Sequence, residues 1–286
     1  MGRLQNKVAI VTGGASGMGK ATVMRFLDEG AMVVVGDLNA DNGAELTDHL
    51  HRMGHVGNFR FVKTDVSCEA DIAQLVTKAE ETFGKLDIMF NNAGIGGAIG
   101  PLGEIEVDHW DYTFAVLTRG VFLGIKHASK VMRTQATGGS IINTASIAGL
   151  GAGNGPTAYS AAKAAVVNLT QSAALELAPD RIRVNCICPG MIFTPLMHRG
   201  DEEMAEATMR QVQPWPDRGE GHHIAAAALY LAEDDSAFVT GEAHLVDGGY
   251  RTAGAISRTS LVGSQNRYSG VTHGSTGRAP DVRKLD

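Results

Sequence analysis

The sequence predicts an α/β domain built on a doubly wound parallel sheet of seven strands with helices on both faces. Short runs of β-branched residues alternate with longer amphipathic stretches, and a glycine-rich turn directly follows the first run. The strand runs are continuously apolar, which is what a parallel strand needs when helices cover both of its faces.

The predicted strands are separated by stretches long enough for a helix between each pair. They are Val8–Val11, Met32–Val35, Phe59–Val62, Leu86–Phe90, Ser140–Asn143, Arg183–Ile187 and His244–Val246. Right-handed crossovers then give the spatial order 3-2-1-4-5-6-7. Ligands of such a sheet collect outside the carboxyl ends of the strands, where strands 1 and 4 meet.

The chain divides into one catalytic domain, residues 1–250, and a C-terminal extension, residues 251–286. Of the 36 residues in the extension, 14 are Gly, Ser or Thr, six are basic and two are acidic. Such ends are commonly mobile. A second hypothesis is that the basic extension packs against a neighbouring subunit near the substrate entrance.

Composition argues against nucleic acid as the main partner and against disulfides, a metal site and a membrane segment. The net charge is -6, and no run of Lys or Arg is long enough to follow a nucleic-acid backbone. The three cysteines contain no Cys-x-x-Cys pair, so we expect no disulfide framework and no metal site, and the reducing cytoplasm fits best. We expect no signal peptide and no membrane segment.

The turn from Thr12 to Gly19 predicts a dinucleotide site. Glycine at 13, 17 and 19 permits positive φ and close approach of the backbone to a pyrophosphate, at the start of a helix predicted near Lys20. This context, strand then turn then helix, is that of the Rossmann fold.

Asp37 ends the second strand, where a carboxylate accepts hydrogen bonds from both hydroxyls of a ribose. Its charge repels a 2'-phosphate, and neither Ser16 nor Leu38 supplies a cation to hold one, so NAD is favoured over NADP. The alternative is that Asp37 only caps a helix that starts near Asn39.

With these features the chain resembles the short-chain dehydrogenase/reductase family from about Leu4 to Tyr250. The matching segments are Thr12–Gly19, Asp65-Val66, Asn91–Gly94, Ser146, Tyr159–Lys163, Pro189-Gly190 and Val246–Gly249. The resemblance implies an NAD-dependent oxidoreductase that acts on a secondary alcohol or ketone. It also implies a homotetramer, with the helices around residues 105–133 and 157–178 as interface helices.

Tyr159 and Lys163 are the candidate catalytic pair. They are four residues apart on a helix predicted to begin near Thr157, so their side chains share one face. A nearby ammonium favours phenolate and is expected to lower the pKa of the phenol, which makes Tyr159 the general acid/base. By resemblance, Lys163 also binds the nicotinamide ribose and Ser146 holds the substrate oxygen. A nucleophilic role for Ser146 is disfavoured because its segment lacks the Gly-x-Ser-x-Gly pattern.

The resemblance also assigns cofactor contacts along the chain. Asp65 and Val66 are expected to bracket the adenine, and Ile192 with Thr194 to hold the carboxamide. The full set is Gly13, Ser16, Gly17, Met18, Gly19, Asp37, Leu38, Asp65, Val66, Asn92, Ala93, Gly94, Tyr159, Lys163, Pro189, Gly190, Ile192 and Thr194. Plainer alternatives stay open: Asn92 can satisfy backbone groups at a strand end, and Val66 can be core.

Leu117 departs from the family pattern. The family has an asparagine three residues before the glycine that is Gly120 here, and this asparagine helps to hold a water of a proton relay. An isobutyl group cannot bond that water, so the relay from Lys163 to solvent must use another route, with Thr118 as a substitute, or be slower. The alternative function is therefore an NAD-binding regulatory or scaffold protein with weakened catalysis.

The substrate is expected to meet Ile147, Ala148, the glycine-rich wall 149–155 and the segment 191–197, under a lid from about 198 to 215. These segments are largely apolar or flexible. They favour an uncharged, fairly hydrophobic secondary alcohol, including cyclic compounds such as terpenoids, steroids or aromatic derivatives.

Overall fold

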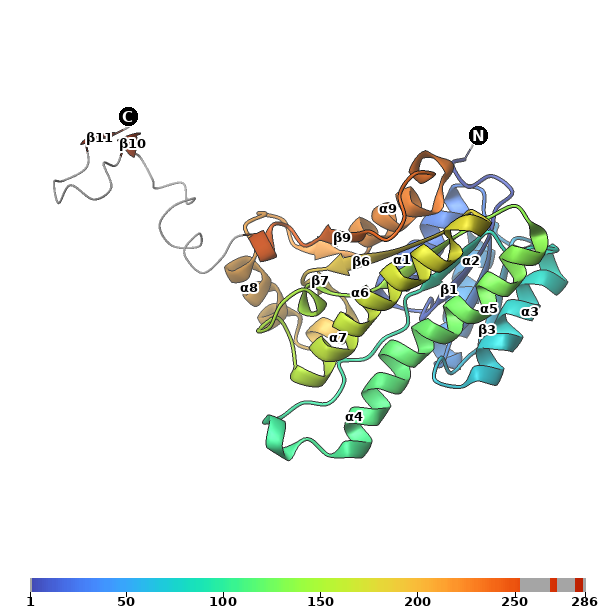
Figure 1. The fold of residues 1–286 in the computed structure, drawn as a ribbon, viewed down its shortest axis with the longest axis horizontal. Coiled ribbons are helices and arrows are strands. Elements are labelled where there is room, and N and C mark those ends of the chain that lie inside the picture. The colour runs from blue at the N-terminus through green and yellow to red at the C-terminus, as the bar shows by residue number, and fades with distance from the viewer. Residues whose placement is uncertain (1, 253–267, 272–280, 285–286) are drawn as a thin grey trace.

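A computed structural model describes residues 2–252, together with the backbone of 268–271 and 281–284. Its central sheet is parallel and has seven strands in the order β3-β2-β1-β4-β5-β6-β9 (Figure 1). The strands are β1 (Val8–Thr12), β2 (Met32–Asp37), β3 (Phe59–Lys63), β4 (Ile88–Asn91), β5 (Gly139–Thr144), β6 (Ile182–Pro189) and β9 (Ala243–Val246). The predicted doubly wound Rossmann sheet and its strand order are confirmed.

Two layers of helices cover the sheet. The helices α1 (Gly17–Asp28), α2 (Ala40–Arg52) and α9 (Gly221–Ala232) pack on one face. The helices α3 (Glu69–Phe83), α5 (Gly120–Gln135) and α6 (Thr157–Leu177) pack on the other, where Figure 1 shows α5 and α6 running side by side.

Strand β1 shows why the apolar runs are continuous. Ala9 and Val11 belong to the core beneath α1 and α9, whereas Val8 and Ile10 belong to the core beneath α3 and α5. All four are completely buried. Successive side chains point to opposite faces, so a strand that is covered on both faces must be apolar at every position.

Helix α1 begins at Gly17, three residues before the predicted start near Lys20. The backbone N–H of Lys20 already donates to the carbonyl oxygen of Ser16 over 3.0 Å, so the first helical turn lies within the glycine turn itself. The predicted start of α6 near Thr157 is confirmed.

The helix predicted around residues 105–133 is interrupted by a wider turn. Helix α4 (Val107–Phe114) continues through a five-residue π-helical turn, Ala115–Arg119, into α5. Such π turns are rare and occur frequently at functional sites. Leu117 lies at its centre.

The segment after β6 forms a small structure that the sequence did not predict. The short strands β7 (Ile192–Phe193) and β8 (Gly219–Glu220) pair in parallel and bring together the two ends of the predicted lid. Between them lie α7 (Pro195–His198) and α8 (Glu202–Val212). Short 3-10 helices complete the body at Leu102–Glu104, Ile147–Gly149, Ala178–Asp180 and Asp234–Ser236.

In the C-terminal extension, β10 (Tyr268–Val271) pairs antiparallel with β11 (Asp281–Lys284). The hypothesis that the extension packs against a neighbouring subunit falls largely outside the described residues. Arg251, the first residue of the extension, donates a hydrogen bond from its guanidinium to the carbonyl oxygen of Leu150 over 3.0 Å.

Candidate active site

The glycine turn between β1 and α1 lies at the carboxyl edge of the sheet. Gly13 has a φ of +61°, and a Cβ there would come within 2.8 Å of the Cα of Ala93. A Cβ on Gly19 would come within 2.1 Å of the carbonyl oxygen of Gly13. Any side chain at these positions would push the turn away from the neighbouring loop, so the turn requires glycine.

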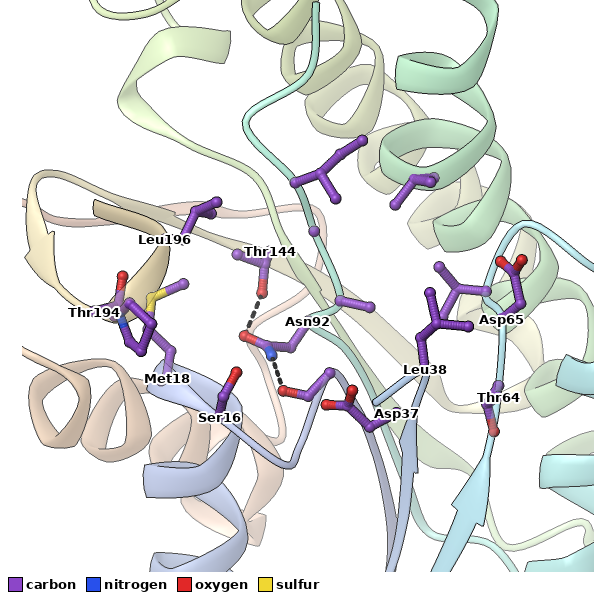
Figure 2. Close-up of a pocket in the computed structure, with 18 of the residues that line it drawn as sticks. Ser16, Met18, Asp37, Leu38, Thr64, Asp65, Asn92, Thr144, Thr194 and Leu196 are labelled. Atoms are coloured by element: carbon purple, nitrogen blue, oxygen red, sulfur yellow. Dashed lines mark hydrogen bonds between the residues drawn. The ribbon is translucent and has the colours of Figure 1, made fainter. Parts of the chain in front are cut away.

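A pocket runs along this edge from Asp37 and Leu38 at one end to Thr194 and Leu196 at the other (Figure 2). Fourteen of the predicted cofactor residues line it: Gly13, Ser16, Gly17, Met18, Asp37, Leu38, Asp65, Val66, Asn92, Ala93, Gly94, Tyr159, Lys163 and Thr194. The pocket therefore joins residues that are up to 183 positions apart in the sequence, from Gly13 to Leu196.

Four other predicted cofactor residues lie behind the pocket wall. Gly19 packs beneath Gly13, and Pro189 is buried at the end of β6. A Cβ on Gly190 would come within 2.8 Å of the Cα of Asp247, and Ile192 is buried in the core beneath α1 and α9. Their positions fit a role in shaping the pocket through packing.

Asp37 ties the glycine turn to the end of β2. One carboxylate oxygen accepts the backbone N–H of Ala15 over 3.0 Å, and the other accepts the N–H of Asn39 over 2.9 Å. The cap of α2 is Asn39, whose side chain accepts two backbone N–H groups over 3.0 Å each. Asp37 therefore does not cap the helix itself, and its carboxylate lies on the pocket wall.

Asn92 lies between the glycine turn and the end of β5, as Figure 2 shows. Its side-chain amide donates to the carbonyl oxygen of Thr12 over 3.0 Å, and its backbone N–H donates to the Thr12 hydroxyl over 2.9 Å. The hydroxyl of Thr144 approaches the Asn92 amide oxygen at 3.5 Å. Asn92 thus satisfies backbone groups at the strand ends and also lines the pocket.

Ser146, Tyr159 and Lys163 meet where β5 and α6 adjoin. The ammonium of Lys163 is 5.6 Å from the centre of the Tyr159 ring, on the same side of α6. The side chain of Ser146 hydrogen-bonds the Tyr159 hydroxyl. The Ser146 hydroxyl oxygen also accepts the backbone N–H of Ala148 over 3.1 Å, which fixes the start of the 3-10 helix Ile147–Gly149.

Burial controls the pKa values of this pair. Burial raises the pKa of Tyr159 above its usual value, and the hydrogen bond from Ser146 partly opposes this rise. Burial also lowers the pKa of Lys163 to about 8. A low-dielectric environment disfavours both charged forms. The expected lowering of the Tyr159 pKa by Lys163 is not found, because burial raises that pKa and the Lys163 ammonium bonds the carbonyl oxygen of Thr144.

Leu117 is completely buried among apolar side chains that include Val66, Ile72 and Ala162. Thr118, the expected substitute for the family asparagine, donates from its hydroxyl to the carbonyl oxygen of Ala162 over 3.2 Å. This bond ties the π turn to α6, so the Thr118 hydroxyl already has a partner there.

A second cleft adjoins the pocket and was not predicted. It shares Ile95, Tyr112 and Leu196 with the pocket, and its other lining residues are Gly96, Gly97, Ala98, Ile99, His109, Thr113 and Arg199. The helix around residues 105–133 was expected only at a subunit interface, because nothing in the local sequence indicates that the loop after β4 lies against the lid. Thr64, Val116 and Thr144 are further pocket residues that the sequence did not indicate, whereas Pro195 belongs to the segment 191–197 that was expected to meet the substrate.

In the described part of the chain, no helix is long and apolar enough to cross a membrane. No group of three or more His, Cys, Asp or Glu side chains in the same part is arranged to hold a metal ion.

Comparisons with known proteins match nearly the whole body of the chain. A family model described as Enoyl-(Acyl carrier protein) reductase matches residues 13–251. The 3beta-hydroxysteroid dehydrogenase 2 of Eggerthella lenta is 40% identical over 251 residues, covering 86% of this chain and 95% of that protein. The cyclohexanol dehydrogenase of Acinetobacter sp. is 37% identical over 248 residues, covering 87% of this chain and 96% of that protein. The crystal structure of levodione reductase matches with a TM-score of 0.82 at 34% identity, covering 87% of this chain and 99% of that one.

Proposed function

The chain belongs to the short-chain dehydrogenase/reductase family of oxidoreductases, which act on secondary alcohols and ketones, and we propose that it uses NAD and Tyr159 to do so. The observation that carries this proposal is the convergence of Ser146, Tyr159 and Lys163 at the pocket that the glycine turn borders.

The pocket fits a dinucleotide at its nucleotide end. Gly13 and Gly17 leave the backbone open beside the N-terminus of α1, where amide dipoles favour a pyrophosphate. The Asp37 carboxylate is oriented by two backbone N–H groups and lies where a ribose would be held. Of the described residues that line the pocket, Lys163 is the only cation, so nothing at the Asp37 end favours a 2'-phosphate. This supports NAD over NADP.

The nicotinamide supplies the carbon that accepts or gives the hydride. In ketone reduction, the Tyr159 hydroxyl donates its proton to the substrate oxygen, and in alcohol oxidation it takes that proton back. The raised pKa keeps Tyr159 protonated at neutral pH, which is the form that reduction requires. Ser146 would hold the substrate oxygen beside Tyr159, and Lys163, which lines the pocket, would bind the nicotinamide ribose.

Remaining cofactor contacts are proposed from their positions in the pocket. Asp65 and Val66 bracket the adenine, Asn92 to Gly94 line the ribose side, and Thr194 faces the carboxamide. Ser16, Met18 and Leu38 complete the wall. Gly19, Pro189, Gly190 and Ile192 hold this wall in place from behind.

The part of the substrate nearest Tyr159 is proposed to be uncharged and hydrophobic. Ile147 and Ala148 are buried beside Ser146, and Ile95, Val116 and Leu196 add apolar surface. The names of two relatives indicate dehydrogenases of a 3beta-hydroxysteroid and of cyclohexanol, which are cyclic secondary alcohols. Both support a ring alcohol or ketone for this chain.

The alternative, a regulatory or scaffold protein that binds NAD, rests on Leu117. The three catalytic candidates are intact, and a protein without this chemistry has no need to bury a lysine beside a tyrosine at the cofactor pocket. We therefore favour the enzyme.

A homotetramer is proposed from exposed apolar side chains on the edge strand β9 and its surroundings. Leu245 on β9 is 39% exposed, Leu175 on α6 is 81% exposed and Phe238 is fully exposed. A second copy of the chain would cover them. Sedimentation equilibrium of the full chain tests the assembly, and a monomer would overturn it.

Cys68, Cys186 and Cys188 are free thiols, which supports the cytoplasm as the location.

A screen of cyclic alcohols and ketones with NAD(H) and NADP(H), followed by cofactor absorbance, tests the function. We expect turnover with NAD, and a loss of about 10² to 10⁴ in Tyr159→Phe. Fluorescence titration of NADH should show unchanged binding by this variant. Activity that survives the loss of the hydroxyl, or a native preference for NADP, would contradict the proposal.

A further inference from the structure

The cleft next to the pocket carries a positive charge at its outer end. It is lined mainly by the loop after β4 and by α4, and it shares Ile95, Tyr112 and Leu196 with the pocket that contains Tyr159. A substrate held at Tyr159 and longer than the pocket would therefore extend past these three residues. The other polar side chains that line the cleft are those of Arg199, His109 and Thr113. The Thr113 hydroxyl is already bonded to the backbone of Ala98 and His109.

Arg199 is held at this end by its backbone. It follows α7, donates its N–H to the carbonyl oxygen of Pro195 over 3.0 Å, and has a φ of +48°. A non-glycine residue with this left-handed conformation is uncommon. Its guanidinium lies over Gly96, where an added Cβ would be 3.1 Å from the Arg199 Nη2. The exposed arginine therefore borders the cleft beside the loop after β4.

No carboxylate neutralises this charge locally. The described residues that line the cleft include no Asp or Glu, and among the described ion pairs none involves Arg199. His109, across the cleft on α4, adds a side chain that donates hydrogen bonds and is never negative. A largely apolar cleft bordered by an exposed guanidinium that has no ion-pair partner among the described residues fits a molecule with an apolar body and an anionic end.

We infer that Arg199 binds a carboxylate at the end of the substrate remote from the reacting hydroxyl, so that the preferred substrates are hydroxy acids with a hydrophobic ring between the two groups. This inference rests on the proposed function. It changes the earlier expectation that the whole substrate is uncharged. Only the part of the substrate that meets Tyr159 needs to be uncharged, and the remote end carries the carboxylate. A guanidinium pairs with a carboxylate through two parallel hydrogen bonds, whereas a neutral amide offers it a single acceptor oxygen.

The test compares carboxylates with their amides. The probes are 4-hydroxycyclohexanecarboxylate, 3-(4-hydroxycyclohexyl)propanoate and the corresponding amides, which differ in reach and in charge. The variant is Arg199→Asn, because asparagine accepts the left-handed backbone and removes the guanidinium with its charge. Arg181→Asn is the matched control: Arg181 is an exposed arginine with a φ of +58° just before β6, at the opposite edge of the sheet.

We expect at least one carboxylate to exceed its amide by about tenfold in kcat/KM, the change that a charge-assisted hydrogen bond of about 1.4 kcal/mol gives. Arg199→Asn should remove this preference by lowering kcat/KM for the carboxylate more than for its amide, and Arg181→Asn should keep the preference. Equal use of acid and amide, or a preference that Arg199→Asn leaves intact, overturns the inference while the proposed function stands.

Calorimetric titration of the two carboxylates into the NADH-loaded protein gives a readout that does not depend on turnover. Binding that weakens about tenfold in Arg199→Asn, and not in Arg181→Asn, supports the inference even where oxidation is slow. Carboxylate binding equal in all three proteins overturns it. Failure of every alcohol and ketone to be turned over, with carboxylate binding still dependent on Arg199, would instead count against the proposed function.

Discussion

The ammonium of Lys163 donates a hydrogen bond to the carbonyl oxygen of Thr144 over 2.6 Å. Thr144 is the last residue of β5, and Lys163 is only 2% exposed on α6. This bond fixes α6 against the carboxyl edge of the sheet and keeps the Lys163 ammonium 5.6 Å from the centre of the Tyr159 ring. A charged group is thereby buried at the site at a cost in stability, which leads to the first prediction.

Replacing Lys163 with Met should stabilise the fold at pH 7 and abolish turnover. Burial lowers the pKa of Lys163 from 10.5 to about 8. The unfolded chain therefore binds the extra proton between about pH 8 and 10.5, and stability of the native protein rises with pH across that window. We expect Lys163→Met to gain roughly 1 to 3 kcal/mol at pH 7, less any cost of the unpaired Thr144 carbonyl, and to lack this rise.

Urea unfolding of both proteins from pH 6 to 10.5 measures the effect. Lys130→Met is the control, because Lys130 is exposed on α5 and its loss should change stability by less than about 0.5 kcal/mol. A Lys163→Met variant that is less stable than the native protein at pH 7 would show that the bond to Thr144 outweighs the burial of the charge.

Ser146→Ala should move the pH dependence of alcohol oxidation to higher pH. The Ser146 side chain lowers the pKa of Tyr159 against the larger effect of burial, so its loss leaves the phenol harder to ionise. Oxidation needs the phenolate, and its alkaline rise in kcat/KM should therefore begin at a higher pH than in the native enzyme. We also expect turnover to fall by about 10², because the substrate oxygen loses its support.

Ser160→Ala is the matched control for this profile, since Ser160 follows Tyr159 and its hydroxyl bonds only the carbonyl oxygen of Gly155 in the described structure. Its profile should equal that of the native enzyme. If kcat/KM of Ser146→Ala rises over the same pH range as in the native enzyme, Ser146 does not affect the ionisation of Tyr159.

Asp37→Asn should weaken the preference for NAD. The substitution keeps the size of the side chain and one acceptor oxygen, and it removes the charge that repels a 2'-phosphate. We expect the ratio of kcat/KM for NAD to that for NADP to fall by about tenfold or more. Asp41→Asn, on the exposed first turn of α2, should leave the ratio unchanged. A native ratio in Asp37→Asn would mean that another group selects the cofactor.

Leu117→Asn should destabilise the protein without improving turnover. Leu117 is 0% exposed among apolar side chains, and an unpaired amide there costs roughly 2 to 4 kcal/mol. Leu123→Asn is the control, because Leu123 lies in the same apolar cluster on α5 and is 3% exposed. Both variants should lose similar stability by thermal unfolding. Faster turnover in Leu117→Asn alone would show that the asparagine restores a proton relay.

The sequence by itself determined the fold and the identity of the catalytic candidates. The apolar runs could be recognised as strands because burial on both faces leaves no polar position, and the helix spacing of Tyr159 and Lys163 placed them on one side of α6. The glycine turn and Asp37 could also be located from the sequence, because their chemistry depends on residues that are adjacent in the chain.

The tertiary structure alone decided the electrostatics and the shape of the site. Three features arise from contacts between segments that are distant in the sequence. They are the raised pKa of Tyr159, the hydrogen bond from the Thr118 hydroxyl to the Ala162 carbonyl oxygen, and the position of the Arg199 guanidinium over Gly96. Burial and hydrogen bonding depend on which side chains surround a group in space, and local periodicity carries no information about that surrounding.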